Sequence, residues 1–372
     1  MSRWAWADVS TAAIEHNVRQ LVGNVASAWP VGVWAVVKAD GYGHGAVTAA
    51  RAAIAGGATG LCVALVQEGV ALRLAGIDVP VLVLTEQPHE ELAAAVAHGL
   101  QLTVYRTEYL EALAAAGGVD VPVHLKLDTG MQRSGARPED AVALADAIAA
   151  SPAARLEGVF THLAVADEPE HPFTREQLDR FDAALDALSA AGHRPRLVHA
   201  ANSAGAIVHP RARYSMVRPG IAIYGISPGP EVDTMVRDLD LRPALSLRSR
   251  VSMVKRVAAG SRISYGLRHR FDADTTVATV PIGYADGVPR RLFAMGGEVL
   301  VGGRRRRIVG VVTMDQLMLD CGDQPVQVGD EVVLIGAQGD HEVTASEWAE
   351  RLGTIGYEVV CGISARVERR PG

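Results

Sequence analysis

The chain has 372 residues, of which 49% are hydrophobic and 21% are charged, as is usual for a globular protein with a sizeable core. Its formal net charge of -6 at pH 7 favours no nucleic-acid partner. Cys62, Cys321 and Cys361 show no CxxC or Cys/His ligand spacing, and Cys62 and Cys361 lie in apolar strand-like runs. We therefore expect neither a disulfide framework nor a structural metal. The sequence shows neither a signal-peptide pattern nor an apolar run of bilayer length, which predicts a cytoplasmic protein without a membrane span.

Up to about residue 240, short β-branched runs alternate with longer alanine-rich runs. The expected strands are 33–38, 61–66, 80–85, 102–106, 122–127, 156–162, 196–202 and 216–225, and helical patterns between them include 46–57, 90–99, 108–118, 138–150 and 175–192. Strands that alternate with helices form parallel βαβ units, and eight of them close a barrel. A doubly wound open sheet is the competing architecture, but no GxGxxG follows the first strand. The sequence therefore predicts an α/β fold in which residues 1–238 form a TIM-type (β/α)8 barrel.

After about residue 240 the pattern changes to strands joined by turns that contain glycine and aspartate. Little helix is expected before 345–353, so residues 239–372 are predicted to form a mostly β C-terminal domain. The run Arg304–Arg307 lies between Gly303 and a strand-like segment, and we interpret it as a solvated turn rather than a phosphate-binding patch.

A set of polar residues follows the predicted barrel strands at the ends where barrel active sites are built. Lys38 closes the first strand, and taken alone it is better explained as a snorkelling side chain. The later strand ends carry Lys126, Arg133, His162, Asn202, Ser203, Arg218 and Gly220. A rim lysine together with an anion site near Ser203 and Gly220 points to pyridoxal 5'-phosphate held as a Schiff base. A Schiff-base aldolase acting on phosphorylated sugars remains the alternative from position alone, although it needs no β domain.

Nine spaced motifs then show a family resemblance that covers nearly the whole chain. In the barrel they are VVKADGYGHG (36–45), HLKLDTGMQRSG (124–135), FTHLAVADE (160–168), HAANSAGA (199–206) and VRPGIAIYG (217–225). In the second domain they are ISYG (263–266), PIGYADGVPR (281–290), TMDQLML (313–319) and YEVVCGISARVER (357–369). With these motifs in this order the chain resembles alanine racemase, a fold-type III pyridoxal-phosphate family.

The resemblance implies a racemase that interconverts L-alanine and D-alanine and supplies D-alanine for peptidoglycan. Lys38 would hold the cofactor and act as one catalytic base, and Tyr265 from the partner in a homodimer with shared active sites would act as the other. The cofactor-binding residues carried over are Lys38, Tyr42, His162, Asn202, Ser203, Arg218, Gly220, Ile221 and Tyr357. Arg133 and Met314 would bind the substrate, while Asp167, Tyr284 and Arg290 would line its entry. Lys126 would be a possible N6-carboxylysine that orients Arg133, and no metal is expected.

Arg218 is the informative member of this set. A guanidinium only donates hydrogen bonds, so a pyridine nitrogen facing Arg218 would stay unprotonated and the cofactor would be a weaker electron sink. Simple proton exchange is the chemistry that such a site favours. Amino-acid decarboxylases of the same fold type would instead present a glutamate to this nitrogen.

Two departures from the family pattern and two further functions complete the interpretation. Val311 stands where arginine is common, which predicts a less cationic and wider entrance, and Thr313 beside Met314 is expected to resize the pocket slightly. A serine racemase or a racemase of broader specificity is one alternative. A non-catalytic pyridoxal-phosphate carrier is the other, but such carriers lack the β domain and hence Tyr265.

Overall fold

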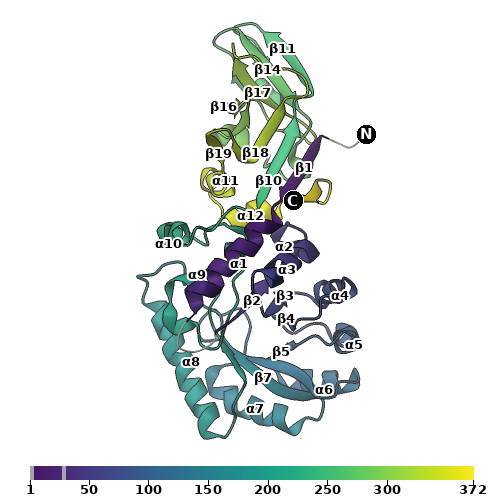
Figure 1. The fold of residues 1–372 in the computed structure, drawn as a ribbon, viewed down its shortest axis with the longest axis vertical. Helices are drawn as coiled ribbons and strands as arrows, with labels where there is room; N and C mark the ends of the chain where they lie inside the picture. Colours follow the sequence, from purple (N-terminus) through teal and green to yellow (C-terminus); the bar gives the residue numbers. More distant parts are fainter. Residues whose placement is uncertain (1–3, 27–30) are drawn as a thin grey trace. The chain divides into compact units, whose positions relative to one another are not determined.

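The computed structural model describes residues 4–26 and 31–372. Two compact units divide the chain. One comprises Ala12–Arg242, and the other comprises the residues up to Thr11 together with Pro243–Gly372. Figure 1 labels their elements along the sequence. Among the described residues, no helix combines the length and the apolar composition that crossing a bilayer requires.

Eight parallel strands form the centre of the first unit. They are β2 (Gly32–Val36), β3 (Gly60–Val63), β4 (Val81–Val83), β5 (Leu102–Val104), β6 (Val121–Lys126), β7 (Ala154–Phe160), β8 (Leu197–His199) and β9 (Met216–Val217). Two four-stranded sheets, β4-β3-β2-β9 and β5-β6-β7-β8, account for all eight. A parallel bridge between Leu82 and Gln101 joins the sheets on one side, and a bond from the amide of Ser215 to the carbonyl of Val198 joins them on the other. The strands therefore close on themselves, and the predicted barrel is confirmed.

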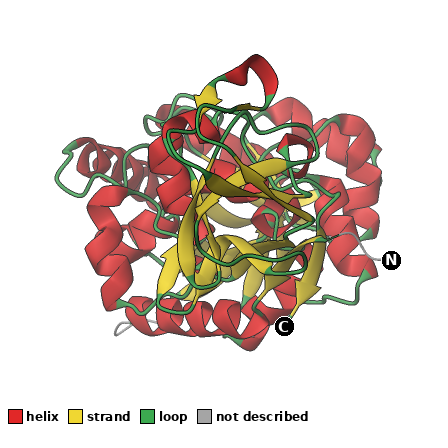
Figure 2. Cartoon of the chain, turned by 90° about the horizontal axis from the view of Figure 1, so that it is seen from above, coloured by secondary structure: helices red, strands yellow, loops and turns green. Residues whose placement is uncertain are grey.

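Helices surround these strands (Figure 2). They are α1 (Thr11–Val25), α3 (Ala46–Ala55), α4 (Val66–Leu74), α5 (Leu92–Ala97), α6 (Thr107–Ala115), α7 (Ala141–Ala150) and α8 (Phe173–Ala190), with the shorter α2 (Lys38–Tyr42), α9 (Ser203–Val208) and α10 (Asp233–Asp238). The buried face of α3 consists of small residues, Ala49, Ala50, Ala52 and Ala53, whereas that of α6 consists of Tyr109, Leu110 and Leu113. Small side chains allow close packing around the strands, and β3 is fully buried.

The second unit is built on a ten-stranded sheet, so the mostly β prediction is also confirmed. Its strands are β1 (Ala5–Val9), β10 (Leu245–Arg250), β11 (Met253–Val257), β14 (Thr275–Val280), β15 (Glu298–Val301), β16 (Arg304–Ile308), β17 (Leu317–Gly322), β18 (Glu331–Gln338), β19 (His341–Val343) and β20 (Glu368–Pro371). A two-stranded sheet pairs β12 (Arg262–Ile263) with β13 (His269–Arg270). Helices α11 (Ala345–Leu352) and α12 (Gly356–Cys361) follow β19.

The N-terminal strand belongs to this sheet and not to the barrel. β1 pairs antiparallel with β10, where Ala7 faces Leu247, and parallel with β20, where Ala7 faces Arg369. The predicted barrel domain, residues 1–238, included this strand. Its pairing partners lie more than 230 residues away, so no local pattern in the sequence indicates the pairing. Strand β1 thus lies between β10 and β20 in the sheet of the C-terminal unit.

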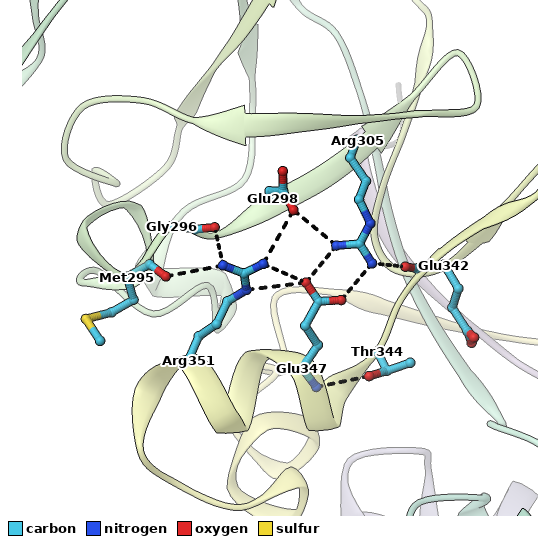
Figure 3. Close-up of polar contacts among 8 residues, drawn as sticks. All are labelled: Met295, Gly296, Glu298, Arg305, Glu342, Thr344, Glu347 and Arg351. Carbon is cyan, nitrogen blue, oxygen red and sulfur yellow. Dashed lines mark hydrogen bonds and ion pairs between the residues drawn. The ribbon is translucent and has the colours of Figure 1, made fainter.

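Two local expectations for this unit were wrong. The run Arg304–Arg307 was expected as a solvated turn, but it forms most of strand β16. In the pairing of β16 with β15, Arg305 lies opposite Leu300. Arg305 escapes like-charge repulsion because it makes ion pairs with Glu298 and Glu347, and Arg351 contacts the same two carboxylates (Figure 3). Cys361, which the sequence placed in a strand-like run, ends helix α12 and is exposed.

Candidate active site

Lys38 stands where β2 ends, at the carboxyl rim of the barrel. The residues that follow form a left-handed turn, with φ of 52° at Ala39, 52° at Asp40, 62° at Gly41 and 53° at Tyr42. Such backbone costs about 1–2 kcal/mol for each residue other than glycine, so the surroundings must hold it in place. Glu68 Oε1 accepts from the amide of Ala39 over 2.6 Å, and Asp40 Oδ1 accepts from the amide of Ala46 over 2.8 Å. This turn fixes the direction in which the chain leaves Lys38.

The segments that follow β8 and β9 meet at Ser203 and Gly220. Ser203 is buried, and its Oγ accepts from the amides of Gly220 over 2.9 Å and Ala222 over 3.3 Å. A Cβ at Gly220 would lie 2.5 Å from Tyr42 Oη, so glycine at this position makes room for that phenol. Because Ser203 Oγ accepts in both of these bonds, its own hydrogen remains available to an acceptor. Asn202 caps α9, with Oδ1 accepting from the amide of Gly205 over 2.9 Å, and Ile221 is buried beside Gly220.

Arg218 follows β9 and is 3% exposed. Its Nη2 donates to the carbonyls of Thr161 over 2.9 Å and Ala200 over 3.1 Å, and its Nη1 donates to His199 Nδ1 over 2.6 Å. No carboxylate of the described chain pairs with this buried guanidinium. Burial lowers the pKa of Arg218 to about 10, which leaves the group charged at neutral pH. An unpaired buried cation that still has free N–H groups suits an acceptor atom or an anion.

His162 lies beside Arg218 and is electrically neutral. Its Nδ1 is 3.5 Å from Arg218 Nη2, a long contact in which the guanidinium is the donor. Burial, followed by the positive charges of Arg218 and Arg133, lowers the pKa of His162 well below its ordinary value. Neighbouring His199 stacks on Phe160 with ring centres 4.6 Å apart. The sequence had not singled out His199 or Phe160 as site residues, although both lie in quoted motifs at the ends of strands.

Lys126 ends β6 and is buried, with Nζ donating to Ser134 Oγ over 2.6 Å. Burial, then the charges of Arg133 and Arg218, lowers the pKa of Lys126 to about 8. Asp128 shapes the next loop, because its carboxylate accepts from the amides of Gln132 over 3.0 Å and Arg133 over 3.1 Å. The side chain of Arg133 is exposed, and Asp167 is half-buried against Gly229. Lys38, Lys126 and Arg218 thus concentrate positive charge at one rim.

Three of the predicted residues of the second unit lie on neighbouring loops of that unit, namely Tyr265, Tyr284 and Met314. Ser264 Oγ donates to the carbonyl of Val311 over 2.8 Å, which ties the turn bearing Tyr265 to the loop bearing Met314. The amide of Tyr284 donates to the carbonyl of Thr313 over 3.0 Å, which adds a third loop.

Glycines permit this close approach of the loops. A Cβ at Gly283 would lie 2.3 Å from the carbonyl oxygen of Thr313, and one at Gly310 would lie 2.6 Å from Ser264 Cβ. Tyr265 and Met314 are 71% and 52% exposed, and Arg290 is exposed as well. Tyr357 is half-buried on α12.

Val311 lies inside the second unit. Its side chain is 1% exposed, so it packs among the buried residues of that unit. Thr313 is half-buried, and its hydroxyl donates to the carbonyl of Gln316 over 2.9 Å. Thr313 therefore shapes the turn that carries Met314 through a hydrogen bond within that turn.

Comparisons with known proteins agree over the whole chain. Residues 9–228 match the family model for the alanine racemase N-terminal domain, and residues 244–371 match the model for the C-terminal domain. An alanine racemase of Symbiobacterium thermophilum is 49% identical over 371 residues, which cover 99% of this chain and 97% of that one. An alanine racemase of Frankia casuarinae is 48% identical over 98% of this chain and 95% of its own.

Solved structures give the same result. An alanine racemase from D-cycloserine-producing Streptomyces lavendulae has a TM-score of 0.93 at 38% identity, covering 100% of this chain and 98% of that chain. An alanine racemase of Bacillus anthracis with bound L-Ala-P has a TM-score of 0.93 at 40% identity, covering 100% and 96%. Both domain models and these whole-length relatives confirm the resemblance found in the motifs, and the chain belongs to the alanine racemase family.

Proposed function

We propose that this chain is a pyridoxal-phosphate-dependent enzyme that interconverts L-alanine and D-alanine, with Lys38 and Tyr265 as its two bases. The observation that carries the proposal is the group of side chains at the carboxyl rim of the barrel. Lys38 stands there with the hydroxyl groups of Ser203 and Tyr42 and with the buried guanidinium of Arg218. The alanine racemases that match the chain over nearly its full length support the same reaction.

The residues present fit the cofactor. Ser203, Tyr42 and Tyr357, with the backbone at Gly220 and Ile221, would hold its phosphate. Arg218 would donate to the pyridine nitrogen, since a guanidinium cannot accept. When bound, pyridoxal phosphate acidifies the Cα proton of an amino acid attached to it. His162 would border Arg218, and Asn202 would act indirectly by capping the helix that begins with Ser203.

Lys38 and Tyr265 would hold and deliver the proton on opposite faces of Cα. An amine and a phenol can each accept and return a proton, which is what inversion requires. Tyr265 is 71% exposed, and we propose that it serves the partner's site in a homodimer. A dimer that shares residues leaves each site incomplete in the single chain.

The remaining positions would handle the substrate. Arg133 would pair with the carboxylate, oriented by Lys126 as an N6-carboxylysine, and Met314 of the partner would complete the pocket. Asp167, Tyr284 and Arg290 would line the approach of the amino acid. In the cell, the product would serve peptidoglycan synthesis from the cytoplasm.

The test is to incubate the purified protein with pyridoxal phosphate and L-alanine in D2O, followed by chiral separation and mass analysis. We expect D-alanine that carries deuterium at Cα, and faster conversion of alanine than of serine in a panel of L-amino acids. Faster conversion of serine would move the assignment to a serine racemase. Bound cofactor without exchange or inversion of any amino acid would contradict the proposal and favour a carrier.

Sharing of sites is tested by co-expressing Lys38→Ala and Tyr265→Phe chains with different tags. Each parent dimer has only damaged sites, whereas a mixed dimer has one intact site when the sites are shared. Activity in the doubly purified mixed dimer supports sharing. Mixed dimers as inactive as both parents would contradict it.

A further inference from the structure

A line of buried polar side chains runs from Arg218 into the barrel interior. Arg218 Nη1 lies 2.6 Å from His199 Nδ1, His199 Nε2 lies 2.9 Å from His124 Nδ1, and His124 Nε2 lies 2.8 Å from Gln101 Oε1. Both histidines are fully buried, and Gln101 is 8% exposed. The four residues belong to different strand segments, so the line crosses the barrel between them.

Arg218 fixes the direction of every bond in this line. A guanidinium has no acceptor, so His199 must present the lone pair of Nδ1 and carry its hydrogen on Nε2. That hydrogen points at His124 Nδ1, which must therefore accept, and His124 in turn carries its hydrogen on Nε2. The last bond then needs an acceptor, which is the carbonyl oxygen of the Gln101 amide.

The opposite direction fails at Arg218. If the amide of Gln101 were turned to donate, His124 would donate from Nδ1 and His199 would present an N–H to the guanidinium. Two donors would then face each other at 2.6 Å in a buried site.

A charged imidazole fails in the same way, because both of its nitrogens are donors. Burial, with the positive charges of Arg218, Arg196 and Arg155, lowers the pKa of His124 to about 3. Burial, with the charge of Arg218, lowers the pKa of His199 well below its ordinary value.

We propose that His124 and Gln101 are positioning residues for the racemase site, acting through His199 to hold the guanidinium of Arg218 in one orientation. The Gln101 amide oxygen is the last acceptor in the line. Each neutral histidine accepts a hydrogen bond at Nδ1 and donates one from Nε2. One Nη1 hydrogen of Arg218 is thereby committed to His199, and the two Nη2 hydrogens are held by the carbonyls of Thr161 and Ala200, which leaves the Nε hydrogen and the second Nη1 hydrogen for the cofactor. The inference rests on the proposed function for its catalytic effect, but the tautomers of the two rings can be observed without turnover.

The direct test is two-bond 15N–1H correlation NMR on the holoenzyme with 15N-labelled histidine, which distinguishes a protonated ring nitrogen from one with a lone pair. Variants His124→Asn and His199→Asn assign the two rings among the 12 histidines. We expect both rings in the Nε2–H form and uncharged from pH 6 to pH 9, values chosen to bracket the ordinary histidine pKa of about 6.5. A charged ring or an Nδ1–H ring at either position overturns the proposal.

Two variants at Gln101 test the effect on Arg218. Gln101→Leu removes the last acceptor, and Gln101→Glu keeps the shape but favours a charged His124, which would reverse the line. For both we expect an altered His199 signal, a changed cofactor absorption spectrum, and a fall in kcat of about 100-fold with little change in KM. Thr103→Val is the matched control, since Thr103 is a buried residue of β5 whose hydroxyl donates to the carbonyl of Val83 outside the line.

The outcomes separate the two proposals. If Gln101→Glu folds and binds cofactor but leaves the His199 tautomer and kcat as in the unmodified enzyme, Gln101 is no positioning residue. If the unmodified enzyme racemises no amino acid while both rings show the expected tautomers, the proposed function fails and the directed line of donors stands.

Discussion

The phenol of Tyr42 occupies the space that a side chain at position 220 would need. A Cβ added to Gly220 would lie 2.5 Å from Tyr42 Oη and 3.0 Å from its Cζ. Tyr42 itself has a φ of 53°, so the left-handed turn after Lys38 aims the ring at this gap. The segment that follows the first barrel strand, β2, and the segment that follows the last, β9, therefore fit together at the proposed phosphate site.

Gly220→Ala should accordingly weaken cofactor binding. The added methyl group must displace the Tyr42 hydroxyl, and we expect the Kd for pyridoxal phosphate to rise about tenfold or more, which corresponds to about 1.4 kcal/mol. Fluorescence titration of the apoenzyme measures it. Gly23→Ala is the control, because a Cβ there meets nothing within 4 Å. An unchanged Kd in Gly220→Ala would show that the phosphate binds elsewhere.

Lys126 should react with carbon dioxide at mildly alkaline pH. Its pKa of about 8 leaves about half of the amines neutral at pH 8, and the neutral Nζ can attack carbon dioxide to form a carbamate with release of a proton. We expect a 13C carbamate signal with labelled bicarbonate that is lost in Lys126→Arg and kept in Lys255→Arg. The signal should grow as the pH rises from 7 to 9, because more amine is neutral. The same signal in Lys126→Arg would assign the carbamate to another amine.

The lowered pKa of Lys126 also has a defined effect on stability. The unfolded chain binds a proton here up to about pH 10.5, whereas the folded amine loses it near pH 8. Between these values the unfolded state holds more protons, so this group makes the free energy of unfolding rise with pH. Carboxylation at Nζ would remove that contribution.

Val311→Arg should destabilise the protein rather than open or close an entrance. The side chain is 1% exposed, and an unpaired buried charge costs about 3–5 kcal/mol. Thermal unfolding of the variant should show a much lower Tm than that of the unmodified enzyme. An unchanged Tm together with altered conversion of larger amino acids would contradict this prediction and indicate that position 311 lines the substrate entrance.

The carboxylate of Glu347 binds two arginines (Figure 3). It accepts from Arg305 Nη1 over 2.7 Å and Nη2 over 2.8 Å, and from Arg351 Nη2 over 3.1 Å. Glu347→Ala should lower the free energy of unfolding by about 2 kcal/mol, in the range for hydrogen bonds to charged groups. Glu350→Ala on the exposed face of the same helix is the control and should have little effect.

The pH dependence of this loss has a definite sign. Hydrogen bonding from Arg305 lowers the pKa of Glu347 below its ordinary value of 4.5. A carboxylate whose pKa is lowered in the folded state stabilises the protein at pH values above its ordinary pKa. This contribution disappears as the pH falls through the pKa of the folded state. Urea unfolding should therefore show a smaller difference between Glu347→Ala and the unmodified chain at pH 3 than at pH 7. A difference that stays constant would indicate lost packing instead of lost charge pairing.

The barrel was predictable from the sequence because its signals are local. The strands are short, mostly buried apolar runs, and longer alanine-containing helical patterns lie between many of them, so the alternation can be counted. The placement of Lys38, Ser203 and Arg218 at one rim follows from that count. Their identity as a group came from the spacing of nine motifs rather than from any single residue.

Other features depend on contacts that the sequence does not display. β1 is defined by pairing with strands near the end of the chain, and β16 tolerates four arginines because distant carboxylates pair with Arg305. The left-handed turn at Ala39 and Asp40 is fixed by Glu68 and by the helix that starts at Ala46. His124 lies within the expected strand 122–127 and Gln101 directly precedes the expected strand 102–106. Neither was a candidate site residue, because only barrel closure brings them into line with Arg218.

The most direct test of the two-base account is hydrogen exchange by Tyr265→Phe in D2O, with L-alanine and D-alanine supplied separately. Phenylalanine keeps the ring and removes the proton-carrying hydroxyl, so Lys38 remains as the only base. We predict deuterium at Cα of one enantiomer without inversion, no exchange from the other, and racemisation reduced at least about 100-fold. Racemisation of both enantiomers at the rate of the unmodified enzyme would contradict the role of Tyr265 and with it the account of the site.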